Sequence, residues 1–206
     1  NSIWVTKNGQ AYAIGSNEYG LIWPSLFKGR LEQDTEIIIR DNENQPYKFL
    51  SVACGYEYTL YLVCKNTPGS IPELIYVHQK RDPFFLNING RTPKALYAGD
   101  TISAVIDTDG GILIFPESIV ETPDMIFSPL FLPDDNKAIQ LACCDEFMIA
   151  LSSLGKVFKA DLSQNKAIHF SKVVELFELN IIHISGLWKH CFAVTDSGSV
   201  FGFGEN

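Results

Sequence analysis

The sequence predicts an all-β protein built from repeated small sheets, which is the arrangement of the blades in a β-propeller. Two observations support this prediction. A hairpin pattern recurs along the chain, and its turn residues stand at positions 9, 66, 110, 155 and 198, giving separations of 57, 44, 45 and 43 residues. Periods of about 40 to 50 residues that contain several strands are typical of propeller blades rather than solenoid coils.

Each copy of the pattern begins with a strand whose alternate residues are apolar. The residues four positions before the turns are Val5, Leu62, Ile106, Leu151 and Val194. The residues six positions before are Ile3, Leu60, Ala104, Ile149 and Phe192. Apolar residues at every second position indicate a strand with one strongly buried face. Four of the five turn centres are glycine and the fifth is Asn66, and both residues tolerate the positive φ that tight hairpins need.

A second strand is expected after each turn. These strands are Ala11–Ile14, Leu74–Val77, Ile112–Phe115, Val157–Phe158 and Val200–Phe203. The second hairpin differs from the others because its turn is an insertion that runs from Lys65 to Glu73 and contains Pro68, Gly69 and Ser70. Long surface loops add only a logarithmic closure cost, so we expect this loop to be dispensable for folding.

An apolar run that ends in small residues precedes four of the hairpins. Cys54, Ala98, Cys143 and Ser185 share the penultimate slot of this run. A slot restricted to small side chains indicates close backbone approach, as where inner strands converge on an axis. Further edge strands are predicted at Ile37–Ile39, Met125–Phe127 and Lys172–Val174. We expect residues 1–206 to form one domain of four to five blades, cut from a longer chain.

Two stretches then resemble a known repeat. Residues 186–206, GLWKHCFAVTDSGSVFGFGEN, and residues 9–22, GQAYAIGSNEYGLI, are similar to the two ends of the repeat of the regulator of chromosome condensation family. The middle copies depart from it, because Tyr58, Ile102 and Phe147 replace the histidine that His190 retains. The resemblance implies a seven-bladed propeller, of which this chain would be a part, and a structural role for His190.

Composition narrows the function. The net charge of -8 argues against a nucleic-acid partner, because such affinity is carried by Lys and Arg that neutralise phosphates. No apolar run is long enough for a membrane span. The five cysteines include no C-x-x-C pair, so we expect a reducing intracellular compartment, cytoplasmic or nuclear, with no disulfide framework, metal or cofactor. We predict that His190 is packed and hydrogen-bonded, and that Cys54 and Cys143 are core residues.

Two classes of function are compatible with the sequence. The first is a non-catalytic interaction platform, or scaffold, for a protein partner. The second, implied by the resemblance, is a guanine-nucleotide exchange factor for a small GTPase of the Ran type, which would need no acid or base catalyst.

The loops that follow the small residues should gather on one face of a propeller. They contain Tyr56, Glu57, Asp100, Asp145, Glu146, Trp188 and Lys189. The sequence therefore predicts an acidic surface with two aromatic anchors that favours a basic protein segment. The alternative is that these residues are ordinary solvated turn residues. The loop with Pro68, Gly69 and Ser70 is a further candidate for partner binding.

Overall fold

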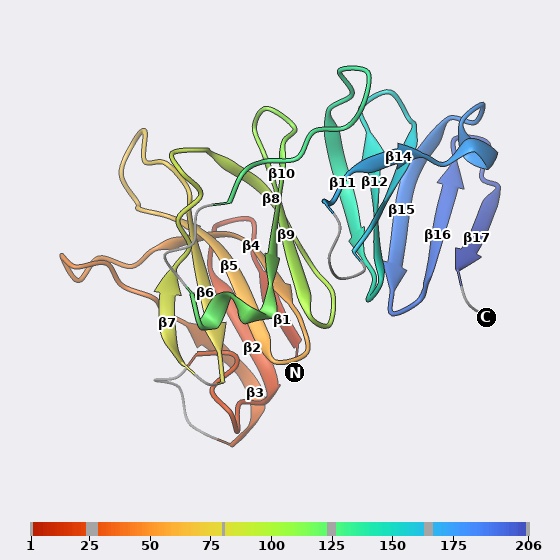
Figure 1. The fold of residues 1–206 in the computed structure, drawn as a ribbon. Coiled ribbons are helices and arrows are strands. Elements are labelled where there is room, and N and C mark those ends of the chain that lie inside the picture. The colour runs from red at the N-terminus through yellow and green to blue at the C-terminus, as the bar shows by residue number, and fades with distance from the viewer. Residues whose placement is uncertain (1, 24–28, 80, 123–126, 163–166, 205–206) are drawn as a thin grey trace. The chain divides into compact units, whose positions relative to one another are not determined.

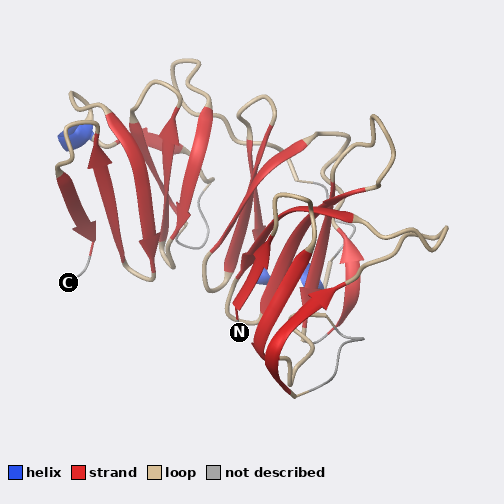
Figure 2. Cartoon of the chain, turned by 180° about the vertical axis from the view of Figure 1, so that it is seen from behind, coloured by secondary structure: helices blue, strands red, loops and turns tan. Residues whose placement is uncertain are grey.

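The computed structural model describes residues 2–23, 29–79, 81–122, 127–162 and 167–204 (Figure 1). Almost all of the regular structure is strand, and the described helices are two short 3-10 turns, η1 (Glu117–Val120) and η2 (Val174–Leu176) (Figure 2). The described parts of 1–96 and 118–126 form one compact unit, and those of 97–117 and 127–206 form another. The two units are described separately.

The first unit contains two antiparallel sheets whose strands follow the order of the chain. The first sheet consists of β1 (Ser2–Val5), β2 (Ala11–Ser16) and β3 (Arg30–Ile37). The second sheet consists of β4 (Lys48–Cys54), β5 (Tyr58–Cys64), β6 (Glu73–His78) and β7 (Arg81–Phe85).

The second unit begins within β8 (Pro93–Ala98), which forms a sheet with β9 (Ile102–Asp107) and β10 (Ile112–Pro116). Two more sheets follow. One contains β11 (Ala138–Cys143), β12 (Phe147–Ser152), β13 (Val157–Asp161) and β14 (Phe170–Lys172). The other contains β15 (Ile181–Leu187), β16 (His190–Thr195) and β17 (Val200–Gly204). Five small sheets in chain order confirm the all-β fold and the four to five blades predicted from the repeat.

The four predicted turn glycines have the positive φ angles that tight hairpin turns need. The φ angles of Gly9, Gly110, Gly155 and Gly198 are 83°, 85°, 71° and 85°. In the second hairpin the left-handed residue is Gly69, at φ 78°, and not Asn66. The insertion moves the tip of the turn, so the sequence alignment of Asn66 with the four glycines was wrong in its structural detail.

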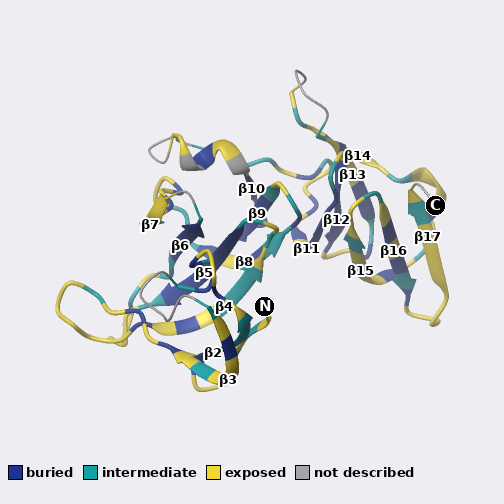
Figure 3. Cartoon of the chain, turned by 90° about the horizontal axis from the view of Figure 1, so that it is seen from below, coloured by how far each residue is buried: buried dark blue, intermediate teal, exposed yellow. Residues whose placement is uncertain are grey.

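The central strands of the sheets are more buried than a strand with one buried face. Every residue of β12 is buried, and so are six of the seven residues of β5. In β12, the side chains of Phe147, Ile149 and Leu151 belong to a core cluster that also contains Ile184 of β15 and Ala193 of β16. Figure 3 shows this contrast within the second unit, where β12 is buried and β17 is largely exposed.

In the first unit, the structure shows the role of the asparagine of the repeat motif. Asn17, which lies in the segment GSNEYG, is 1% exposed. Its side-chain Nδ2 donates to the carbonyl of Trp23 at 3.1 Å, and its Oδ1 accepts from the backbone N–H of Ile22 at 2.9 Å. This asparagine therefore holds the loop after β2. The corresponding Asn206 lies outside the described residues.

The predicted edge strands are placed less well. Of Ile37–Ile39, only Ile37 belongs to β3, and of Lys172–Val174, only Lys172 belongs to β14. Val174 instead begins η2. Met125 and Ile126 lie outside the described residues, and Phe127 is not in a strand. Outer strands pack on fewer neighbours, so a short apolar run marks their ends poorly.

Candidate functional site

The predicted surface residues of the second unit come from three turns, each of which joins an inner strand to the next strand. The turns are residues 99–101 between β8 and β9, residues 144–146 between β11 and β12, and residues 188–189 between β15 and β16. Close backbone approach explains the glycine in the first turn, because a Cβ on Gly99 would lie 2.8 Å from the carbonyl oxygen of Cys143. This glycine directly follows Ala98, so the close approach lies one residue after the slot for which the sequence predicted it.

Direct contacts join the second and third turns. The backbone N–H of Asp145 donates to the carbonyl oxygen of Trp188 at 2.7 Å. The ammonium of Lys189 lies 3.4 Å from Oε1 of Glu146. Because Asp100 interacts electrostatically with Asp145, residues from all three turns form one neighbourhood. We call Asp100, Asp145, Glu146, Trp188 and Lys189 the three-turn surface.

Asp145 is the acidic residue of the three-turn surface that has a buried carboxylate oxygen. Its Oδ1 is buried, and among the described residues it has no hydrogen-bond partner. Burial and the nearby carboxylate of Asp100 raise the pKa of the Asp145 carboxyl, Lys189 opposes this effect, and Glu146 adds to it. Removing an ion from water and placing it near like charges both disfavour the charged form. The surface therefore holds negative charge that its single lysine does not balance.

Trp188 provides the aromatic part of the surface. Its side chain is 62% exposed and its backbone φ is 60°. A left-handed conformation costs a bulky residue about 1 kcal/mol. The neighbouring Leu187 is also an exposed apolar residue. The sequence placed Leu187 in the same loop as Trp188 but did not single it out as a candidate binding residue, and the structure makes it the last residue of β15.

The first unit contains the other predicted residues at two separate places. Tyr56 is 75% exposed and lies with Glu57 in the turn between β4 and β5. Pro68, Gly69 and Ser70 lie in the loop between β5 and β6, at the opposite end of β5. That loop is closed internally, since the Ser70 hydroxyl donates to the carbonyl of Lys65 at 2.6 Å. The two predicted groups therefore do not form one site.

Two residues that the sequence assigned to the interior differ from expectation. His190 is exposed, with its ring edge-on to that of Phe192 at 5.9 Å, so the prediction of a packed, hydrogen-bonded histidine was wrong. Cys54 is exposed, whereas Cys143 is buried as predicted. The positions of His190 and Cys54 in the repeat did not reveal this exposure.

The described residues show neither a cluster of metal-binding side chains nor a helix that could cross a membrane. No group of three or more His, Cys, Asp or Glu side chains within them could hold a metal ion. Among the helices that the structure describes, none is long and apolar enough to cross a membrane.

Comparison with solved structures defines the class of fold. The chain has the β-propeller fold of proteins of the regulator of chromosome condensation type. It is similar to human WBSCR16, with a TM-score of 0.72 and 16% identity over 99% of this chain and 59% of that one. It is also similar to yeast RCC1 (Prp20) in its complex with Kap60, with a TM-score of 0.69 and 14% identity over 98% of this chain and 53% of that one.

A second structure of Prp20p, from Saccharomyces cerevisiae, has a TM-score of 0.68 and 13% identity, over 97% of this chain and 55% of that one. Prp20p binds Gsp1p and histones. This chain thus spans a little over half the length of these similar proteins. No protein-family model and no curated protein matches the sequence.

Proposed function

We propose that this chain is a non-catalytic propeller platform, and that its three-turn surface binds a basic segment of a protein partner. The observation that carries the proposal is the link between Asp145 and Trp188, in which a 2.7 Å backbone hydrogen bond joins the turn with a partly buried carboxylate to the turn with an exposed indole. Arginine and lysine side chains bind to this combination, because they pair with carboxylates and stack on aromatic faces.

The electrostatics of the surface support a basic partner. Among the five residues of the three-turn surface, Asp100, Asp145 and Glu146 face one cation, Lys189, which is already paired with Glu146. Burial, Asp100 and Glu146 raise the pKa of Asp145 against the opposing effect of Lys189. A guanidinium from a partner would supply a positive charge and lower this pKa again.

The left-handed backbone conformation of Trp188 is a second observation that supports this proposal. A tryptophan that is exposed and left-handed costs stability without burying its ring. Aromatic residues of this kind are common energetic centres of protein interfaces. Glycine or asparagine would fit the turn better if stability alone determined this position.

The solved structures that resemble this chain support only the general proposal that its partner is a protein. Prp20 binds Kap60, Gsp1p and histones, all of them proteins. Tyr56, Glu57 and the loop with Pro68, Gly69 and Ser70 stay predictions for partner contacts of the first unit.

An exchange factor for a Ran-type GTPase is the second candidate, favoured by the similarity of the fold to Prp20. It makes a separate prediction. The chain would accelerate release of a fluorescent GDP analogue from such a GTPase, whereas a platform would leave the release rate unchanged.

Charge reversal tests the platform. We expect Asp100→Lys combined with Asp145→Lys to weaken binding of a nona-arginine peptide at least tenfold at low salt, because surface attraction is least screened there. Binding is measured by isothermal titration at 20 mM and 300 mM salt. Unaltered affinity at low salt would exclude the three-turn surface as the binding site.

A matched variant controls for net charge. Glu32 and Asp34 are exposed acids on β3 of the first unit, and the pair Glu32→Lys with Asp34→Lys changes the net charge by the same amount. This control should reduce peptide affinity by less than about threefold. Circular dichroism and thermal unfolding of both variants establish that the fold is kept.

A further inference from the structure

The second unit contains three cysteines in two neighbouring sheets. Cys143 ends β11, Cys144 follows it in the turn to β12, and Cys191 is the second residue of β16. All three are buried. Cys144 and Cys191 belong to one core cluster, which does not include Cys143.

Cys144 and Cys191 meet at Gly186 of β15. A Cβ placed on this glycine would lie 2.7 Å from Cβ of Cys191 and 3.1 Å from Sγ of Cys144. Both cysteines thus approach the same point on the backbone of β15, and only a residue without a side chain leaves room for them. Gly186 pairs directly with Cys191 in the β15–β16 register.

The two thiols also interact with each other, and this interaction is the largest cause of the lowered pKa of Cys144 and of the raised pKa of Cys191. Each thiol also donates to a backbone carbonyl oxygen, Cys191 to that of Phe203 at 3.6 Å and Cys144 to that of His190 at 3.7 Å. The positive charge of Lys159 adds to the lowering of the pKa of Cys144, which burial and Asp145 oppose, and it works against the rise of the pKa of Cys191. The thiolate is the reactive form of cysteine, so Cys144 is the better nucleophile of the pair.

Cys143 lacks these features. It is fully enclosed, and burial raises the pKa of its thiol to about 12. Adjacent residues at the end of a strand direct their side chains to different sides. The neighbour of Cys144 in the sequence is therefore not its partner in space.

We propose that Cys144 and Cys191 form an oxidation site, at which a hydroperoxide converts the two thiols to a disulfide that links the sheet β11–β14 to the sheet β15–β17. The thiolate of Cys144 attacks the terminal peroxide oxygen, the O–O bond breaks, and an alcohol or water leaves with a proton. The resulting sulfenic acid is attacked by the sulfur of Cys191, which forms the S–S bond and releases water. The two thiols lose two electrons and two protons, and the peroxide accepts them.

An open pocket reaches Cys191, whereas Cys144, which attacks the peroxide, is not part of its lining and is buried. Cys191 contributes to the wall of an open pocket of about 680 Å³, together with Trp188, Phe192 and Phe203. Because the side chain of Cys191 is itself buried, reaction requires a local opening. We expect disulfide formation over minutes to hours rather than seconds.

The bond would join the turns that carry the three-turn surface. Cys144 immediately precedes Asp145, and its thiol donates to the carbonyl oxygen of His190 at 3.7 Å, two residues from Trp188. Oxidation would therefore fix the relative positions of these turns. This inference does not depend on the identity of a partner, because it concerns the chemistry of the thiols alone.

Peptide mapping tests the proposal directly. The intact chain, carrying Cys54→Ser and Cys64→Ser to remove the other thiols, is treated with hydrogen peroxide, alkylated and digested with trypsin. We expect the peptide of residues 138–156 to be cross-linked to that of residues 190–206. The oxidised protein should melt about 5 to 10 °C above the reduced protein, because the bond restricts the unfolded chain. Dithiothreitol should reverse both changes.

Single substitutions identify the sulfur atoms involved. Cys143→Ser should still form the cross-link, whereas Cys144→Ser and Cys191→Ser should not. Lys159→Gln should slow the reaction severalfold. A bond between Cys143 and Cys144, oxidation to sulfinic acid without a cross-link, or no modification of the folded protein would each overturn the proposal. The mapping on the chain with all three thiols decides this even if a variant fails to fold.

Discussion

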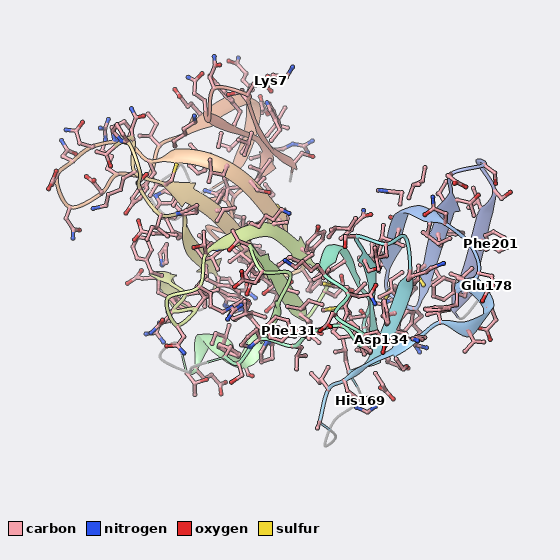
Figure 4. The ribbon with its side chains drawn as sticks, turned by 90° about the horizontal axis from the view of Figure 1, so that it is seen from above. Lys7, Phe131, Asp134, His169, Glu178 and Phe201 are labelled. Atoms are coloured by element: carbon pink, nitrogen blue, oxygen red, sulfur yellow. The ribbon has the colours of Figure 1, made fainter. Side chains whose placement is uncertain are left out.

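The sheets β11–β14 and β15–β17 of the second unit are built on the same repeat but differ in burial. Ile149 and Phe192 occupy the same slot, six residues before a turn glycine, yet Ile149 is 0% exposed and Phe192 is 46% exposed. Phe201 of β17 lies in the edge strand of its sheet (Figure 4). The sheet that best matches the repeat motif is therefore the less buried one.

The comparison shows that a sheet of this fold can form without the residues of the repeat motif. The sheet β11–β14 lacks the motif histidine and still pairs four strands in order. Its hairpin follows from apolar alternation and from the turn glycine Gly155, at φ 71°. The predictions below test how far the two sheets differ, beginning with the largest effect.

Replacing the residue at this shared slot with alanine should give the largest difference in stability between the two sheets. We expect Ile149→Ala to reduce the free energy of unfolding by about 3 kcal/mol, because it leaves a cavity in the core cluster. Phe192→Ala should cost less than about 1 kcal/mol, since much of its ring is already in water. Urea denaturation of both variants measures the difference, and equal losses would contradict the comparison.

The turn glycines offer a second matched pair. A Cβ on Gly155 would clash with Oδ1 of Asn180, whose amide donates to Asp196, whereas a Cβ on Gly198 would meet no atom of the described residues within 4 Å. Both glycines have positive φ, so both Ala variants should lose about 1 kcal/mol. Gly155→Ala should lose about 1 kcal/mol more, because Asn180 must move. Thermal unfolding would reveal this order, and its inversion would be evidence against the turn geometry.

Trp188 makes the turn of the less buried sheet unusual. Within residues 144–146, which form the matching turn of the other sheet, no φ is positive, whereas that of Trp188 is 60°. We expect Trp188→Asn to raise the free energy of unfolding by about 0.5 to 1 kcal/mol, since asparagine tolerates this conformation. The same variant should bind nona-arginine more weakly. A loss of stability would show that the indole packs in the fold.

Protonation of Asp145 should give the smallest effect. Its pKa is raised in the folded chain by burial and by Asp100, so the folded state binds the proton more tightly than the unfolded state. Stability should then fall as pH rises from the ordinary carboxyl pKa through the raised value. Asp145→Asn should melt higher than the unsubstituted protein at pH 7 and lose that advantage at pH 3. A parallel pH profile for both proteins would contradict this assignment.

Much of the fold could be predicted from local patterns. The central hairpins were predictable because alternating apolar residues and turn glycines are set by the backbone itself. The ends of β3 and β14 were not, because each pairs with only one strand of its sheet. The exposure of His190 and Cys54 was also missed, since it depends on which sheet faces are covered, and no residue of the repeat encodes that.

The sequence identified residues of the three-turn surface but not the contacts that join its turns. The sequence placed Asp100, Asp145 and Trp188 in equivalent turns. It could not indicate the backbone hydrogen bond between Asp145 and Trp188, or the contact of Cys144 with Cys191, because both join segments more than 40 residues apart. Such contacts follow only from the packing of one sheet on the next.

Fluorine NMR of the chain labelled with 5-fluorotryptophan tests the central claim most directly. The chain contains three tryptophans, and Trp188→Phe identifies the resonance of Trp188. On titration with nona-arginine at low salt, we expect the Trp188 resonance to shift to saturation while the resonances of Trp4 and Trp23 stay in place, and nona-glutamate should have no effect. If the peptide binds and the Trp188 resonance does not move, the three-turn surface is not the site of interaction.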